Sequence, residues 1–116
     1  MTKLNIIINN IKFRTTLEDN ITAKEFIKLL PLKIEMNQLH KKELYYYLKN
    51  NLPTNNIKKD KVEIGTLYLL KDNCLVLSYD TYSINEEYTP IATIDSPEDL
   101  KSIISNNESE VIIELI

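Results

Sequence analysis

The chain has 116 residues, of which 43% are hydrophobic, and a formal net charge of −3, so we expect one domain over residues 1–116 with a single core that needs no disulfides. The negative charge disfavours a nucleic-acid partner. No apolar stretch is long enough to span a membrane, and the first residues do not resemble a signal peptide. Together with the lone cysteine, these features predict a cytoplasmic protein. One histidine and one cysteine cannot build a His/Cys zinc site, and a single glycine excludes a glycine-rich phosphate loop, so we expect no metal and no cofactor.

The chain opens with a pattern typical of a β-hairpin over residues 3–18. Apolar residues occupy alternate positions from Leu4 to Ile8, which places them on one face of a strand. Asn9 and Asn10 follow, and asparagine tolerates the positive φ angles of a tight primed turn. The strand after the turn alternates in the same way.

A short helix is predicted after this hairpin. Thr22 and Glu25 have the spacing of a capping box, in which the two side chains cap the first turn of a helix. Pro31 disfavours helical backbone at the residue before it, so we expect the helix to end at Leu30.

Two further strands and a long loop come next. Apolar residues alternate over residues 32–37, and residues 44–48 read Leu-Tyr-Tyr-Tyr-Leu, a composition that favours strand. Residues 50–56 are rich in Asn, Pro and Thr, which predicts a loop. The loop runs into a charged stretch over residues 58–63 that we interpret as solvated.

Gly65 opens a second β block. Two apolar runs cover residues 66–71 and 74–79, and the Asp-Asn pair between them predicts a two-residue turn. A weaker strand is predicted over residues 88–94. Pro90 cannot donate a ladder hydrogen bond, so it indicates an edge or a bulge in that strand.

The last part of the chain predicts a helix and a strand. Ser96 followed by Pro97 is a typical helix start, and the Asn-Asn pair at residues 106–107 predicts its end. Residues 111–116 read as a final strand. With about eight short strands and two short helices, the chain is mainly β, and many short strands favour a closed barrel or sandwich.

Several spaced blocks carry a resemblance to a known family. They are residues 45–48, 52–55, 65–67, 73–77 and 88–89, together with the opening hairpin and the helix start at residues 95–98. This set resembles small prokaryotic cyclophilin-like proteins over essentially the whole chain. The resemblance implies one cyclophilin-like domain, a closed β-barrel of about eight strands with two short helices. It implies no activity, because a shared fold does not determine function.

The chain also departs from the pattern of these relatives. Thr66 stands where the relatives tend to have aspartate, and Pro90 stands where they tend to have a basic residue. Residues 84–92 carry two glutamates instead. If this segment lines the family's pocket, its charge is inverted here, and a ligand common to the relatives need not bind this chain.

The enzyme hypotheses find little support in the residues. Cyclophilins use an arginine to catalyse prolyl isomerisation, but the only arginine is Arg14, in the first hairpin opposite the apolar face. The Phe-x-x-Phe-x-x-Gln-Gly stretch is absent. Cys74 and His40 could form a nucleophile and base, but Cys74 begins an apolar strand and His40 lies among lysines. We therefore name no catalytic residue and keep a weak prolyl isomerase as an alternative.

The seven tyrosines are the most informative feature for function. Tyr82 and Tyr88 flank a polar segment that contains Glu86, and they could line a cleft with Thr54 and Asn55 from the loop. Such a cleft would bind a small polar ligand or an extended peptide by stacking and hydrogen bonds. The preferred hypothesis is a non-catalytic binding module, and an accessory protein-interaction domain is the other alternative. The structural explanation of the tyrosines, without a ligand, is that they pack within the barrel.

Overall fold

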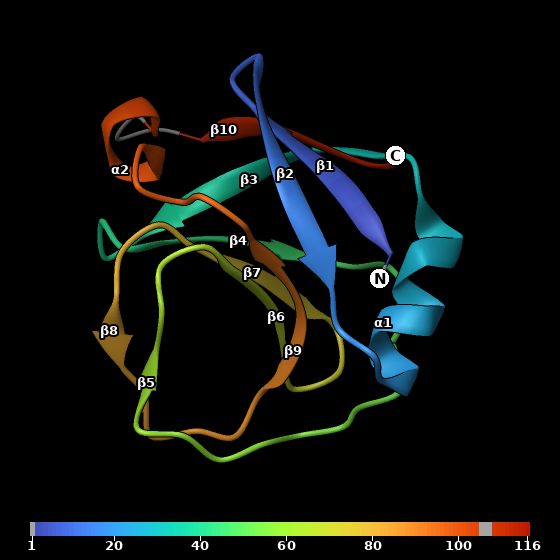
Figure 1. Ribbon diagram of the computed structural model, residues 1–116. Coiled ribbons are helices and arrows are strands. Elements are labelled where there is room, and N and C mark those ends of the chain that lie inside the picture. The colour runs from blue at the N-terminus through green and yellow to red at the C-terminus, as the bar shows by residue number, and fades with distance from the viewer. Residues whose placement is uncertain (1, 105–107) are drawn as a thin grey trace.

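The computed structural model describes residues 2–104 and 108–116 and contains a closed antiparallel β-barrel (Figure 1). Its strands are β1 (Lys3–Ile8), β2 (Ile11–Leu17), β3 (Leu32–Leu39), β4 (Glu43–Tyr47), β6 (Thr66–Leu70), β7 (Cys74–Ser78), β9 (Thr89–Ile94) and β10 (Ser109–Leu115). They close in the order β1-β10-β3-β4-β7-β6-β9-β2. The structure thus confirms the predicted mainly-β class and the barrel of eight strands.

The first hairpin forms as predicted. Ile8 pairs with Ile11, so the turn contains only Asn9 and Asn10, whose φ angles are 49° and 73°. These positive values are those of a primed turn, whose twist matches that of the two strands. The register then places Ile6 opposite Phe13, with both side chains facing the interior.

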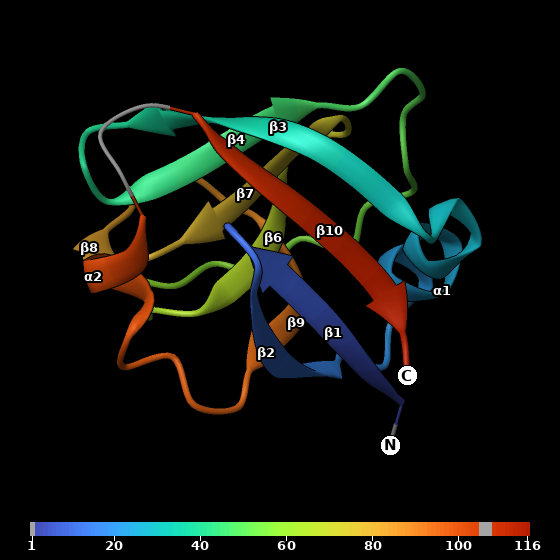
Figure 2. The same cartoon turned by 90° about the horizontal axis from the view of Figure 1, so that it is seen from above.

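The barrel interior is filled by the apolar residues of alternating patterns. In β1, for example, the alternate residues Leu4, Ile6 and Ile8 are completely buried. The same period of two buries Val111 and Ile113 in β10, which pairs with β1 and β3 (Figure 2). Closure leaves no free outer strand in the order of the barrel, which satisfies the backbone hydrogen bonds that an open sheet would expose.

A second, smaller sheet lies outside the barrel and was missed at the sequence level. It consists of β5 (Lys61–Val62) and β8 (Tyr82–Ser83), which pair antiparallel. Beneath it, a second apolar cluster covers the outer face of β6 and β7; its buried members are Val62, Tyr68, Cys74, Val76 and Tyr88. The segment predicted as a charged, solvated loop therefore has one completely buried residue, Val62.

The first helix is α1 (Ile21–Phe26), continued by a 3-10 turn, η1 (Ile27–Leu29). The predicted capping box is wrong: the cap is Asn20, whose side-chain oxygen accepts a hydrogen bond from the Ala23 amide at 2.8 Å. Thr22 is instead buried, and its hydroxyl donates to the Pro53 carbonyl at 2.6 Å. The predicted end is confirmed, because Leu30 leaves the helical conformation.

The second helix, α2 (Leu100–Ile103), is one turn long and begins later than predicted. Its N-cap is Asp99, which makes no side-chain capping hydrogen bond. The predicted start at Ser96 is therefore wrong; Pro97 takes part in a turn, in which its carbonyl accepts from the Leu100 amide at 3.1 Å. The predicted end at residues 106–107 lies outside the described residues.

Two turn details separate the prediction from the structure. Leu70 pairs directly with Cys74, so the turn between β6 and β7 has three residues, with Lys71 at a φ of 59°. The predicted two-residue turn is wrong because the pairing of β6 with β7 ends at Leu70, one residue before the predicted end of the run. The bulge predicted at Pro90 is confirmed, since the pairing of β6 with β9 shifts between Leu67 and Tyr68.

No helix within the described residues is long and apolar enough to cross a membrane.

Candidate functional site

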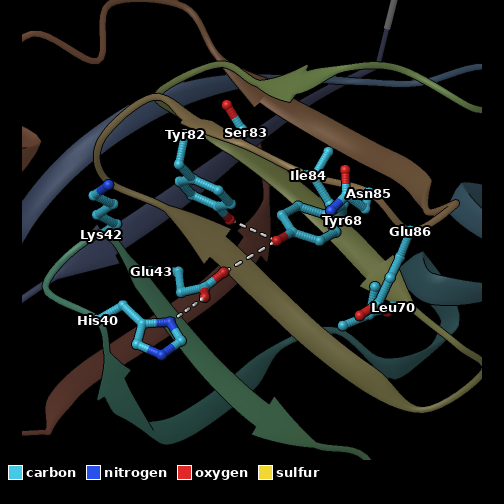
Figure 3. A pocket seen from close by; sticks show the side chains of 10 residues that line it. All are labelled: His40, Lys42, Glu43, Tyr68, Leu70, Tyr82, Ser83, Ile84, Asn85 and Glu86. Atoms are coloured by element: carbon cyan, nitrogen blue, oxygen red, sulfur yellow. Dashed lines mark hydrogen bonds and ion pairs between the residues drawn. The ribbon is translucent and has the colours of Figure 1, made fainter.

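A cavity of about 490 Å³ lies outside the barrel, between the β3–β4 turn, β6 and the segment that begins with β8 (Figure 3). Its lining is mixed, with charged, hydroxyl, amide and apolar side chains. The lining residues are His40, Lys42, Glu43, Tyr68, Leu70, Tyr82, Ser83, Ile84, Asn85 and Glu86.

The tight turn between β3 and β4 presents one side of this cavity. His40 and Lys41 both have a φ of 55°, and the Lys41 amide donates to the Gln38 side chain at 2.7 Å. This turn delivers Glu43 as the first residue of β4, where it pairs with Leu39 and Ser78. The Glu43 side chain is held at the wall of the cavity with 16% exposure.

Tyr68 lies on the outer face of β6. Its neighbours Leu67 and Leu69 belong to the barrel core, so alternation turns Tyr68 to the opposite side. There its ring packs against Tyr88, with centroids 5.0 Å apart, and only 1% of the residue is exposed. The hydroxyl emerges at the edge of the cluster, toward the cavity.

A chain of hydrogen bonds joins three side chains from three different elements. The Tyr68 hydroxyl donates to Glu43 Oε2 at 3.2 Å and lies 2.5 Å from the Tyr82 hydroxyl. A carboxylate can only accept, and a phenol has one proton to donate. Because Tyr68 gives its proton to Glu43, Tyr82 must donate to Tyr68. Figure 3 shows the two phenol oxygens meeting above the carboxylate.

Burial raises the pKa of both phenols. For Tyr68, loss of solvation is the main cause, and the neighbouring Glu43 carboxylate adds to it. For Tyr82, loss of solvation again comes first, followed by the hydrogen bond to Tyr68. An ionised phenol beside a carboxylate in a poorly solvated place is unfavourable. Both hydroxyls therefore stay protonated at neutral pH, and the direction of the chain is defined.

Charged groups surround the other side of the cavity. His40 Nδ1 lies 3.6 Å from Glu43 Oε1, which is beyond hydrogen-bond distance, and the histidine side chain is 76% exposed. Lys42 and Glu86 are exposed at the rim. The lining thus carries two carboxylates and one ammonium group, in addition to the imidazole.

The structure distributes the predicted ligand-binding residues over different places. Tyr82 and Glu86 line this cavity. Tyr88 is buried in the second cluster and faces a separate hollow beside Ile57. Thr54 and Asn55 line neither cavity; the Asn55 amide donates to the Thr89 hydroxyl at 3.0 Å. The five residues therefore do not form one common cleft.

Sequence reasoning missed Glu43 and Tyr68 as members of the site. Tyr68 carried a usable signal, because a tyrosine between two core leucines must face away from the barrel. Glu43 carried none, since it is one of several charged residues around a turn. Its position becomes meaningful only when β4 and β6 are brought together on either side of β7.

Of the residues in the enzyme hypotheses, Arg14 and Cys74 do not line this cavity, whereas His40 does. Arg14 is exposed and, with Asp95, lines a different hollow. That hollow shares no lining residue with the cavity beside Tyr68 and Tyr82. Burial raises the pKa of the Cys74 thiol, and the Glu43 charge raises it further; an activated thiol needs the opposite shift. Cys74 also does not line the cavity that His40 lines. Among the described residues, no three His, Cys, Asp or Glu side chains are grouped to hold a metal ion.

Comparison with known proteins supports the same fold. The model of the cyclophilin-like family matches residues 6–115, and no curated protein sequence matches. Among solved structures, that of McbB in complex with tryptophan is similar, with a TM-score of 0.59 and 14% sequence identity. The match covers 96% of this chain but only 44% of McbB, so at this identity it shows a shared fold alone. The family match extends over nearly the whole chain and agrees with the observed barrel. The chain therefore belongs to the cyclophilin-like family.

Proposed function

We propose that this domain is a non-catalytic binding module that holds a small polar ligand, or one side chain of an extended peptide, in the cavity beside Tyr82. The observation that carries the proposal is the hydrogen-bonded chain from Tyr82 through Tyr68 to Glu43. It holds polar atoms in fixed positions at the wall of a cavity. Fixed polar groups of this kind orient ligands and give a site its specificity.

The size and the lining of the cavity support the same proposal. A volume of about 490 Å³ lies within the range of about 300–1,000 Å³ that is typical of small-molecule sites. Leu70 and Ile84 provide an apolar part of the wall, against which the body of a ligand can pack. Polar atoms at one end and apolar surface at the other favour an amphipathic ligand over a purely charged one.

The similar fold of McbB suggests one probe. The structure of that protein is described as a complex with tryptophan, so a barrel of this shape can accompany the binding of a small aromatic amino acid. Tryptophan therefore belongs in a panel of probes for this chain. Its use rests on the shared fold and not on shared residues.

The composition of the chain bears on the cellular compartment and the partners of the module. The net charge of −3 and the lone cysteine support a cytoplasmic domain that has no nucleic-acid partner. Burial of that cysteine is consistent with a thiol that packs as a small apolar side chain.

The experiment is an NMR titration of the ¹⁵N-labelled protein with separate probes: 2-phenylethylamine, 2-phenylethanol, 3-phenylpropionate, tryptophan and a short Ala-Pro peptide. We expect at least one probe to give saturable shifts of the amides from Tyr82 to Glu86. Ser83→Trp, which puts a large ring at the cavity, should abolish them. Asn37→Trp, an exposed position on β3, is the matched control and should leave them unchanged.

Two results would contradict the proposal. One is the absence of saturable shifts at these amides with every probe. The other is binding that persists unchanged in Ser83→Trp. The peptide sample also tests the isomerase alternative, since uncatalysed prolyl exchange takes on the order of tens of seconds or longer; exchange on a sub-second timescale would revive it and make Arg14 the first residue to replace.

A further inference from the structure

The direction of the hydrogen bonds in the cavity narrows the class of ligand. We propose that the cavity selects ligands that carry a protonated amine, which binds by donating hydrogen bonds to Glu43 and to the Tyr82 oxygen. This inference rests on the proposed function, namely that the cavity is a ligand site. It adds the chemical class of the ligand.

Both phenol protons are already in use. Tyr68 donates its proton to Glu43 Oε2, and Tyr82 donates its proton to Tyr68. Each phenol has one proton only. Neither hydroxyl can therefore donate to a ligand without breaking the chain, and a ligand that needs donors finds none at the centre of the site.

Hydrogen-bond acceptors remain available in the cavity. The Tyr82 oxygen receives no proton from Tyr68, so its lone pairs are available on the side of the cavity. The Glu43 carboxylate can accept about four hydrogen bonds; Tyr68 supplies one of them, and the Tyr82 hydroxyl also interacts with this carboxylate. His40 Nδ1, at 3.6 Å from Oε1, is within ion-pair distance of the carboxylate but too distant to supply another hydrogen bond. A group with several donors fits these atoms, and a primary ammonium has three.

The charges around the cavity also favour a cation. Glu43 and Glu86 provide two carboxylates, against the ammonium of Lys42 and the imidazole of His40, which pairs with Glu43 when it is protonated. Figure 3 shows the end of Lys42 pointing away from the Glu43 carboxylate, so Glu43 is not neutralised by it. His40 is 76% exposed and can stay in solvent when a ligand enters. A cationic ligand gains from this arrangement, whereas an anionic ligand is repelled.

The side-chain amide of Asn85 has both donors and acceptors. It lines the cavity on the side away from His40 (Figure 3). It can contact a neutral polar group of the ligand whichever way that group is oriented. The selection for an amine therefore comes from Glu43, Tyr82 and the charge of Glu86, and not from Asn85.

Three of the probes have nearly the same body and differ in the end group, which makes them the direct test. We expect the amine to bind at the Tyr82–Glu86 amides about tenfold or more tightly than the alcohol, because a hydrogen bond to a charged group is worth more than a neutral one. The carboxylate should bind more weakly than the alcohol. Dissociation constants come from the same NMR titrations at neutral pH.

Glu43→Gln is the decisive variant because it keeps the shape of the side chain and removes its charge. We expect it to weaken amine binding about tenfold or more and to change alcohol binding by less than about threefold. Glu35→Gln, at an exposed position on β3, should leave both unchanged. Unperturbed amide spectra away from the cavity show that the variant is folded.

Tyr82→Phe tests the second acceptor. It removes the phenol oxygen and should weaken amine binding severalfold, while Tyr47→Phe, at a tyrosine that is 63% exposed, should not. The inference is overturned, and the proposed function kept, if the alcohol or the carboxylate binds in the cavity as tightly as the amine, or if Glu43→Gln leaves amine binding unchanged. Absence of binding by every probe overturns both.

Discussion

The ring of Tyr68 packs against the ring of Tyr88 with centroids 5.0 Å apart and planes inclined by 58°. One ring comes from β6, and the other from the residue just before β9. Tyr88 also pairs through its backbone with Ile57. This contact joins the barrel wall to the segments that cross outside it, so the wall of the candidate site depends on the packing of two tyrosines.

The first prediction concerns the stability provided by this contact. Tyr88 is 4% exposed, and truncation of a buried aromatic side chain leaves a cavity, so Tyr88→Ala should lower the free energy of unfolding by about 3 kcal/mol. Tyr47→Ala, at a largely exposed tyrosine, should lower it by less than about 1 kcal/mol. Urea denaturation of the two variants measures both values. Equal midpoints would show that the second cluster contributes nothing to stability.

The second prediction concerns Gly65, which has a φ of +88° and begins the approach to β6. A Cβ atom at this position would lie 2.7 Å from the Pro97 Cβ, and the backbone angle itself is unfavourable for other residues. Gly65→Ala should therefore destabilise the protein by about 2–4 kcal/mol, as measured by chemical denaturation.

Replacement of Pro97 separates the two causes. Pro97→Gly removes the clashing ring but leaves the φ angle of Gly65 as it is. In the double variant, we expect the effect of Gly65→Ala to shrink by about 1 kcal/mol or more, which is the coupling typical of residues in contact. Strict additivity of the two substitutions would contradict the close approach.

Local rules account for most of the barrel that could be predicted from the sequence. Alternation identified the strand around Ile6, and a continuous apolar run identified the strand around Leu67. The Asn9-Asn10 pair identified a turn whose φ angles are indeed positive. Such features depend on neighbours within a few residues. The family resemblance supplied the closure of the barrel, which local patterns left open between barrel and sandwich.

The parts that were missed depend on contacts between distant residues. Tyr68 meets Glu43 across 25 positions of the chain and Tyr82 across 14. The order of the barrel brings these residues together, and no local pattern contains it. The wrong helix start at Ser96 has a related cause. A typical start was present, but Pro97 lies close to Gly65 in the fold, and the residues after it form a turn before the helix begins.

The third prediction concerns alkaline pH. Burial raises the pKa of Tyr68 and Tyr82 above the value of about 10 found in unfolded chains. The stability that depends on these neutral phenols is therefore complete below pH of about 10 and is lost as the pH rises further, because the unfolded chain ionises first. Tyrosinate absorbance should show at least these two phenols not ionising until the circular dichroism signal is lost.

A variant of one of these phenols and a matched control test the assignment. Tyr82→Phe should reduce the number of late-ionising tyrosines, whereas Tyr47→Phe should not. Ionisation of all seven tyrosines in the folded protein, before any loss of circular dichroism, would show that the hydroxyl chain is open to solvent.

The fourth prediction concerns acid pH and the carboxylate of Asp95. Thr16 donates to it at 2.6 Å and Lys3 at 2.9 Å, and these two hydrogen bonds lower its pKa. Its contribution to stability is present above the unfolded pKa of about 4 and is lost as the pH falls through the lower value of the folded state. The stability difference between the wild type and Asp95→Asn should therefore be constant above about pH 5 and shrink in stronger acid. Urea denaturation across this range measures it, with Asp19→Asn, whose side chain is 98% exposed, as the control that should follow the wild type. A difference that stays the same at every pH would show that the contact from Lys3 and Thr16 does not favour the ionised carboxylate.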